Sequence, residues 1–291
     1  MSREQGLGLY RRTAEASAAP VIRRYSNSFR LATSLFPRRT RPAIGAIYAL
    51  VRIADEIVDG TAAEAGLDPA EQRARLDELE AETARAIATG FSANLVVHAF
   101  ADVARGCDIP SEPIRAFFAS MRRDLDAVDF DDAEFRTYIH GSAEAVGLMC
   151  LRVFLAGRPV EAGTLAELES GATRLGAAFQ KVNFLRDLPH DASALGRGYF
   201  PGLAPGTIDE SAKAAIVAEI RADLAAASRA VPRLPRDCRR AVRVATSIFG
   251  ELLRRIERLP ASRLAQERVS VPSLVKAAIA LRWSLVPWGA A

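Results

Sequence analysis

The chain has 291 residues, 49% of them hydrophobic and 25% charged, with 19 glycines and 15 prolines. These proportions are typical of a globular protein and exclude a collagen-like, low-complexity or disordered chain. The net charge of +4 comes from basic and acidic residues mixed along most of the chain, so it does not form the basic stripe of a nucleic-acid-binding protein.

Two further observations limit the class of protein. No apolar run approaches the roughly 20 residues of a membrane-spanning helix, and the polar start MSREQGLGLYRR does not resemble a signal peptide, so we expect a cytoplasmic protein. The three cysteines are far apart, which excludes a disulfide scaffold and a zinc site of the CxxC type.

Helical periodicity recurs along the chain, and no segment shows convincing alternation with period two. The first predicted helix begins at Pro42, since proline is favourable in a first turn, and runs to about Val58. The second begins after Asp68 and ends before Gly90. Further helices are predicted at about 92–105, 113–126, 132–156, 164–188, 210–230, 235–258 and 273–286. A long loop is predicted at 192–209, and no linker divides the chain, so we expect one all-α domain over residues 1–291.

A polar stripe runs along the helix predicted at 42–58, beside the apolar face that we expect to be buried. Its residues follow at intervals of four, three and four, which places them on one helix face: Tyr48, Arg52, Asp55 and Asp59. The helix predicted at 164–188 has a similar stripe with intervals of three, four and four: Gln180, Asn183, Asp187 and Asp191. A weaker stripe on the helix predicted at 132–156 contains Tyr138 and Ser142.

An acidic pair at this spacing is more often a solvated helix face, as we expect for the pair that begins at Glu78. The pairs Asp55/Asp59 and Asp187/Asp191 lie on largely apolar helices, where unpaired buried charges would cost several kcal/mol each. We therefore expect both pairs to face an interior cavity and to bind divalent cations.

Oxygen ligands without histidine or cysteine favour Mg²⁺, with Mn²⁺ as the alternative, over zinc. Mg²⁺ held by carboxylates usually also binds phosphate oxygens of a substrate. Two acidic helix faces across an apolar pocket therefore indicate a substrate with a diphosphate head and a long apolar chain. The chemistry that suits such a site is the departure of diphosphate from an allylic carbon, with the cations neutralising the leaving group.

Five sequence blocks resemble the squalene/phytoene synthase family in order and spacing, and their amino-acid sequences are most similar to those of bacterial phytoene synthases. They are YSNSF (25–29), AIYALVRIADEIVD (46–59), YIHGSAEAVGLMC (138–150), QKVNFLRDLPHD (180–191) and GRGYFP (196–201). The resemblance implies an isoprenoid-synthase-type helical bundle that encloses a central cavity. It further implies the head-to-head condensation of two geranylgeranyl diphosphates to phytoene, through the cyclopropylcarbinyl (prephytoene) diphosphate, in carotenoid biosynthesis and without NADPH.

The resemblance also implies roles for residues that match the family's blocks. The metal ligands would be Asp55, Asp59, Asn183, Asp187 and Asp191. Catalysis would involve the four aspartates together with Tyr138 and Arg52. Substrate binding would involve Ser28, Phe29, Tyr48, Gln180, Asn183, Arg186, Arg197 and Tyr199.

Three residues depart from the family's pattern. Pro189 lies inside the second aspartate block and removes a backbone donor, so we expect the helix to end there. Phe249 stands where many relatives have a tyrosine thought to contact diphosphate. Thr33 replaces a pocket-lining phenylalanine of some relatives, which widens the expected channel and is consistent with a longer substrate.

Three alternatives to phytoene synthesis stay open at this point. The same chemistry on two farnesyl diphosphates would give squalene or dehydrosqualene. The same fold can transfer a prenyl group to a non-isoprenoid acceptor, in which case one prenyl diphosphate is consumed per turnover. A non-catalytic helical assembly protein is disfavoured because all four aspartates are present.

Two other segments invite functional interpretations. The aspartates between Asp124 and Asp132 lack the glycine and terminal glutamate of an EF-hand loop, so we expect a solvated loop, although the family resemblance gives Asp124 a counterpart. The segment SLVKAAIALRWSLVPW (273–288) is expected to be an ordinary packing helix, with peripheral contact to a membrane surface as the alternative.

Overall fold

The computed structural model describes residues 3–126, 130–195 and 197–285, without the side chains of a few of them, Ser28 included. These residues form helices and no strand, which confirms the all-α prediction. The α-helices are α1 (Arg3–Tyr25), α2 (Asn27–Ser34), α3 (Arg41–Val58), α4 (Thr61–Glu64), α5 (Pro69–Thr89), α6 (Leu95–Gly106), α7 (Ser111–Arg123), α8 (Asp132–Ile139), α9 (Ala145–Leu155), α10 (Ala162–Leu195), α11 (Glu210–Ala230), α12 (Arg236–Arg258), α13 (Ala261–Leu264) and α14 (Ser273–Leu285). A π-helical turn, η1 (His140–Glu144), joins α8 to α9, and a 3₁₀ turn, η2 (Val231–Arg233), follows α11.

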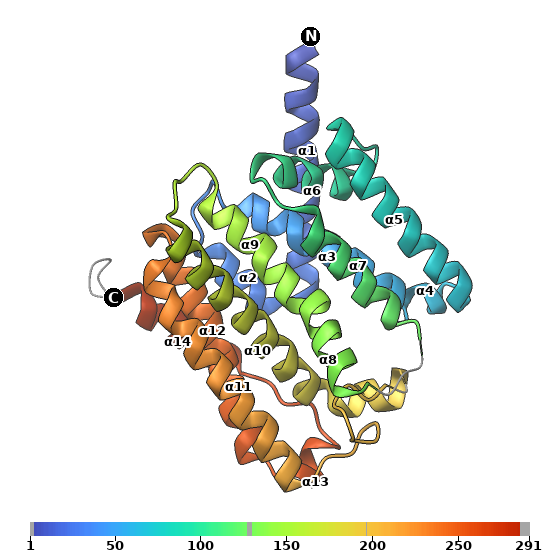
Figure 1. The fold of residues 1–291 in the computed structure, drawn as a ribbon, viewed down its shortest axis with the longest axis vertical. Helices are drawn as coiled ribbons and strands as arrows, with labels where there is room; N and C mark the ends of the chain where they lie inside the picture. Colours follow the sequence, from blue (N-terminus) through green and yellow to red (C-terminus); the bar gives the residue numbers. More distant parts are fainter. Residues whose placement is uncertain (1–2, 127–129, 196, 286–291) are drawn as a thin grey trace.

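The helices pack around two hydrophobic cores (Figure 1). One core includes Ile47, Phe100 and Phe117 and joins α3, α6 and α7 with their neighbours. The other includes Leu185 and Ile256 and joins α10, α11 and α12. Helix α9 packs against both α3 and α10, so it connects the two halves. The two polar stripes predicted from the sequence lie one in each half.

Local sequence signals explain several helix boundaries. Asp68 accepts a hydrogen bond from the Glu71 backbone N–H at 2.9 Å, and the Glu71 side chain accepts one from the Asp68 N–H. Such a capping box stabilises a helix start by about 1 kcal/mol. At the other end of α5, Gly90 has φ +79°, a left-handed conformation that glycine adopts without steric cost.

The π-helical turn η1 lies very close to its neighbours because glycines form the contacts. A Cβ atom on Gly141 would lie 2.1 Å from the Ala116 carbonyl oxygen of α7. A Cβ on Gly176 of α10 would lie 2.5 Å from the Ala143 carbonyl oxygen of the turn. Both positions therefore require glycine. The turn directly follows Tyr138, and π-helical turns are frequent at functional sites.

The predicted segments agree with the structure in most places. Helices α1 and α2 and the short helices α4 and α13 were not predicted, and the segment predicted at 132–156 is divided into α8, η1 and α9. The expectation that α10 ends at Pro189 is wrong, because the helix continues to Leu195. The proline removes one backbone donor, but the turns on either side of it remain helical, so the predicted long loop begins after Leu195.

Candidate functional site

The polar stripe of α3 forms one wall of the candidate site. Arg52 donates hydrogen bonds to Asp55 at 2.5 Å and to Glu56 at 2.7 Å, and its guanidinium lies 4.5 Å from the centre of the Tyr25 ring. Asp59 is the C-terminal cap of the helix, and its backbone N–H bonds the Asp55 carbonyl oxygen at 2.8 Å. The two predicted aspartates of this helix are therefore close together, as their spacing indicates.

The carboxylates at the end of α3 are crowded. Burial raises the pKa of Asp55 above its usual range, and the charges of Asp59 and Asp124 raise it further against the opposing charge of Arg52. One arginine thus compensates only part of the negative charge. A group of partly buried acids with too few cationic partners is the electrostatic setting in which a divalent cation binds.

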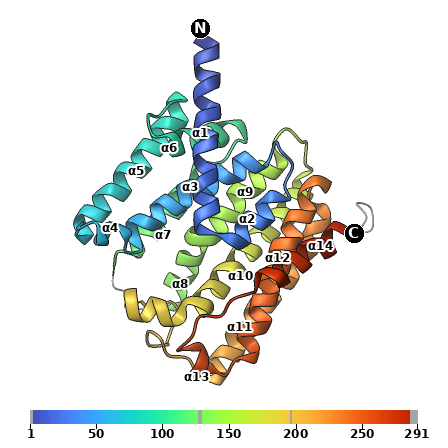
Figure 2. The ribbon, with the colours of Figure 1, turned by 180° about the vertical axis from the view of Figure 1, so that it is seen from behind.

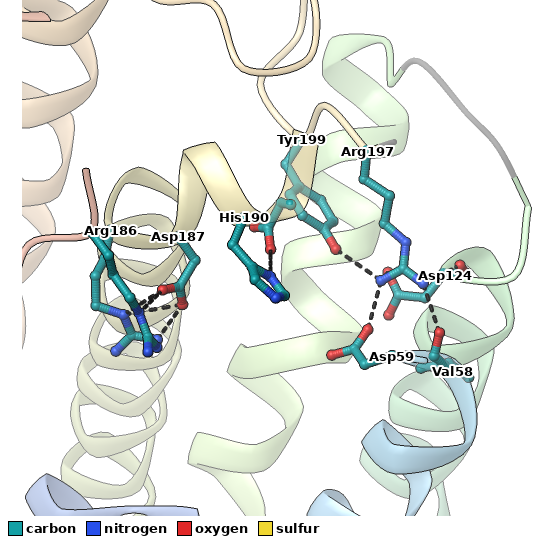
Figure 3. A network of polar contacts seen from close by, with 10 residues as sticks. Val58, Asp59, Asp124, Arg186, Asp187, His190, Arg197 and Tyr199 are labelled. Atoms are coloured by element: carbon teal, nitrogen blue, oxygen red, sulfur yellow. Dashed lines mark hydrogen bonds and ion pairs between the residues drawn. The ribbon is translucent and has the colours of Figure 1, made fainter. Parts of the chain in front are cut away.

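Arg197 connects the chain after α10 to the end of α3 (Figure 3). Its guanidinium donates to the Asp59 carboxylate at 2.6 Å, the Val58 carbonyl at 2.8 Å and the Asp124 carbonyl at 2.6 Å. The Arg197 side chain is only 13% exposed. Since burial of an arginine requires such partners, this contact holds residues 197–201 of the predicted binding block against the end of α3.

Asp124 belongs to the same group, although the sequence indicated a solvated loop. It caps the end of α7, is buried, and accepts a hydrogen bond from the Tyr138 hydroxyl at 2.7 Å. Burial raises the pKa of Asp124 to about 7, with the charge of Arg197 opposing this and that of Asp59 adding to it. The solvated-loop expectation is therefore wrong for Asp124. Asp126, Asp131 and Asp132 are exposed as expected, but Asp131 caps the start of α8 and Asp132 is its first residue, so of these three only Asp126 lies in a solvated loop. Asp129 lies outside the described residues.

Aromatic rings cover this group of polar side chains. Tyr138 and Tyr199 are both buried, with ring centres 5.5 Å apart. Tyr199 stacks on Phe184 of α10 at 3.9 Å, and Arg197 donates to its hydroxyl at 3.3 Å. Burial raises the pKa of both tyrosines, so their hydroxyls stay protonated near neutral pH.

The polar stripe of α10 forms the second wall (Figure 3). Arg186 donates to Asp187 at 3.0 Å, and Arg268, from the segment between α13 and α14, donates to the same carboxylate at 2.6 Å. Burial raises the pKa of Asp187, but the hydrogen bonds and charges of the two arginines outweigh it, and the pKa lies below its usual range. Burial and the charges of Asp187 and Asp59 raise the pKa of Asp191 to about 6.

Arg197 joins the two walls, because its backbone N–H donates to the Asp191 carbonyl oxygen at 3.0 Å while its guanidinium donates to the Asp59 carboxylate. The Asn183 side-chain oxygen, on the same stripe, is buried without a hydrogen-bond partner among the described residues, as is the Ser142 hydroxyl. Gln180 lies half-buried on α10. An unpaired buried amide oxygen on the same helix face as two carboxylates is the type of atom that binds Mg²⁺. In the described conformation, however, no three His, Cys, Asp or Glu side chains converge on one position for an ion.

Two further aromatic pairs lie near these walls. Phe29 of α2 stacks on Tyr48 of α3 at 5.1 Å. Phe249 of α12 stacks on Phe179 of α10 at 3.8 Å, so the ring that replaces the family's tyrosine packs against another ring. Thr33 is buried and its hydroxyl has no partner among the described residues. The side chain of Ser28 lies outside the described residues.

The structure therefore groups Asp55, Asp59 and Asp124 with Arg197, Tyr138 and Tyr199, and it places Asp191 next to this group. Asp187 pairs separately with Arg186 and Arg268. Sequence reasoning missed Arg268 as a partner of Asp187 and placed Asp124 outside the site. Nothing in the local sequence marks Arg268. The sequence signal that could have identified Asp124 is its position directly after an amphipathic helix, where a carboxylate can be buried as a C-terminal cap.

Comparisons with known proteins identify chains that are similar to this one. A family model described as squalene/phytoene synthase matches residues 22–203. The phytoene synthase of Mycobacterium tuberculosis is 28% identical over 281 residues, which cover 89% of this chain and 87% of that protein. The chloroplastic phytoene synthase 3 of Zea mays is 33% identical over 186 residues, 62% of this chain, and the match spans 41% of the maize protein.

Solved structures share the fold at lower identity. A dehydrosqualene synthase in complex with a ligand has a TM-score of 0.78 and 22% identity, with 94% of this chain and 96% of that chain covered. The squalene synthase HpnC from Alicyclobacillus acidocaldarius has a TM-score of 0.71 and 21% identity, with 89% and 97% covered. These likenesses show the isoprenoid-synthase helical fold.

Proposed function

Since the chain belongs to the squalene/phytoene synthase family, whose members are prenyltransferase-type enzymes acting on prenyl diphosphates, we propose that it is a Mg²⁺-dependent phytoene synthase. It joins two geranylgeranyl diphosphates C1 to C1, through the cyclopropylcarbinyl diphosphate. The observation that carries the proposal is the meeting of two acidic helix faces, joined by Arg197 between Asp59 and Asp191, beside stacked aromatic rings. The similarity to bacterial phytoene synthases over most of the chain supports this substrate pair.

The residues that would hold the metal are the two aspartate pairs and Asn183. Bound Mg²⁺ would neutralise the negative charge that develops on the departing diphosphate. In the described conformation, arginines hold three of the carboxylates. These pairs are Arg52–Asp55, Arg197–Asp59 and Arg186–Asp187. We infer that these guanidinium groups turn to phosphate oxygens when substrate binds, since a guanidinium group forms paired hydrogen bonds with phosphate and with carboxylate.

The aromatic residues serve the apolar part of the substrate. The stacked rings of Tyr138, Tyr199 and Phe184 lie directly beside the acidic group and exclude water from it. Ring faces also stabilise a nearby carbocation electrostatically. The pairs Phe29/Tyr48 and Phe179/Phe249 line the walls on which the prenyl chains would lie.

The test is product analysis by mass spectrometry. The purified protein is incubated with geranylgeranyl or farnesyl diphosphate, with and without Mg²⁺ and NADPH. We expect phytoene from geranylgeranyl diphosphate, dependent on Mg²⁺ and independent of NADPH. A clear preference for farnesyl diphosphate with release of squalene or dehydrosqualene would refute the substrate assignment, and consumption of one prenyl diphosphate per turnover with an acceptor would refute the reaction.

A further inference from the structure

Helix α14 packs on the bundle with one face and leaves a leucine face exposed. On the packed face Ala280 is buried, and the Trp283 indole donates a hydrogen bond to the Ser247 hydroxyl of α12 at 2.8 Å. Three leucines at intervals of seven and four lie on the opposite face: Leu274, 85% exposed, Leu281, 61%, and Leu285, 74%. Figure 2 shows α14 on the outer side of the molecule beside α12. Packing within the chain therefore accounts for only one face of this helix.

A groove of about 610 Å³ lies next to the leucine face, between α11, α12 and α14. Its floor is apolar and includes Leu224 and Trp283. Four arginines line it: Arg221, Arg254, Arg258 and Arg282. We call this groove, which these four arginines line, the arginine groove. It is lined by residues of α11, α12 and α14, and none of them belongs to the acidic stripes of α3 and α10.

The arginine groove carries an excess of positive charge. Glu257 is the only acidic residue that lines it, and this carboxylate pairs with Arg221 at 2.6 Å. Arg254 pairs with Glu251 at 2.6 Å. Within the described residues, Arg258 and Arg282 have no acidic partner. By its position on the helix, Arg282 lies between the groove and the leucine face, so charge and apolar surface are continuous.

We propose that this side of the molecule docks on an anionic phospholipid bilayer. The leucine face enters the interfacial layer, and the arginine groove contacts lipid phosphates, which guanidinium groups bind with paired hydrogen bonds. Within the described residues no helix is long and apolar enough to cross a bilayer, so the contact is peripheral. A second copy of this chain suits the surface less well, because a twofold contact would bring two arginine-rich grooves together. The proposal uses no residue of the candidate active site.

The experiment is co-sedimentation of the whole protein with vesicles, without substrate. Vesicles of phosphatidylcholine alone are compared with vesicles of equal parts phosphatidylcholine and phosphatidylglycerol. We expect binding to the anionic vesicles that falls with added salt. Each basic residue near an anionic surface contributes about 1 kcal/mol, so Arg258→Glu and Arg282→Glu should each lower the partition coefficient by about fivefold or more. Leu281→Ser combined with Leu285→Ser should abolish binding.

Matched controls are Arg85→Glu on α5 and Leu9→Ser on α1, exposed residues of the same types elsewhere on the molecule. These variants should bind like the wild type, and circular dichroism should show the same helical signal for all variants. Equal binding by the controls and by the groove and leucine variants would overturn the proposal. Absence of vesicle binding by the wild type, or a dimer in sedimentation velocity that the leucine variants dissociate, would also overturn it.

Discussion

At the end of α3, Asp55 and Asp59 repel each other beside a buried Asp124, whereas on α10 Asp187 accepts hydrogen bonds from Arg186 and Arg268. Burial and neighbouring carboxylates raise the pKa of Asp55, while arginines bring the pKa of Asp187 below its usual range. The first aspartates of two pairs with the same sequence spacing thus occupy opposite electrostatic environments, whereas Asp191, with its pKa raised to about 6, resembles Asp55.

This difference indicates a division of roles. Asp187 is ionised at neutral pH through its arginines, so it is a carboxylate before any cation binds. The carboxylates around Asp55 gain most from an added cation, because only Arg52 and Arg197 offset their charge. The α3 wall should therefore give the metal site its pH dependence, and the α10 wall should give it a fixed anionic partner.

The largest effect is expected from variants that remove one carboxylate charge from the α3 wall or from the α10 wall. We expect Asp59→Asn and Asp187→Asn each to lower turnover on the order of a thousandfold, since each loses several kcal/mol of leaving-group stabilisation. Diphosphate release measures the effect, and Glu78→Gln, on the exposed α5 surface, is the control. Wild-type turnover in either variant would remove that wall from the site.

Two arginines from outside the walls, Arg197 and Arg268, differ in how deeply they are buried. Arg197 is 13% exposed and donates to four acceptors, whereas Arg268 is 64% exposed and donates to one carboxylate. Arg197→Gln should lower the free energy of unfolding by about 3 kcal/mol, because it leaves buried acceptors unpaired. Arg268→Gln should lower it by less than about 1 kcal/mol. Urea denaturation measures both, and equal losses would contradict the comparison.

A smaller effect is expected on the pH dependence of stability. The pKa of Asp124 is about 7 in the folded protein and lower in the unfolded chain, so the folded state binds more protons between the two values. Its contribution to stability is fully present at low pH and is lost as the pH rises through about 7.

With a chelator present, the wild type should therefore lose about 2 kcal/mol from this group between about pH 5 and pH 8. Asp124→Asn should show a flatter profile over the same range. Urea denaturation at several pH values checks this, and parallel profiles for the two proteins would show that Asp124 is not held in the described environment.

The sequence predicts the helices that carry the site because polar residues recur at helical spacing beside apolar ones on α3 and α10. It does not predict α1, whose Gly6, Gly8 and Pro20 weaken the helical pattern. The contacts of Arg197 and Arg268 depend on segments far apart in the chain, so no local pattern contains them. Asp124 was misplaced because its neighbours are exposed aspartates and only tertiary packing buries it.

The central claim is that carboxylates of α3 and α10 hold the same bound divalent ions. Electron paramagnetic resonance of Mn²⁺ tests this directly by counting bound ions on the wild type, Asp55→Asn and Asp187→Asn, in the presence of inorganic diphosphate. The account predicts that the wild type binds Mn²⁺ tightly and that both variants lose tight binding. Unchanged Mn²⁺ binding in both variants would contradict it.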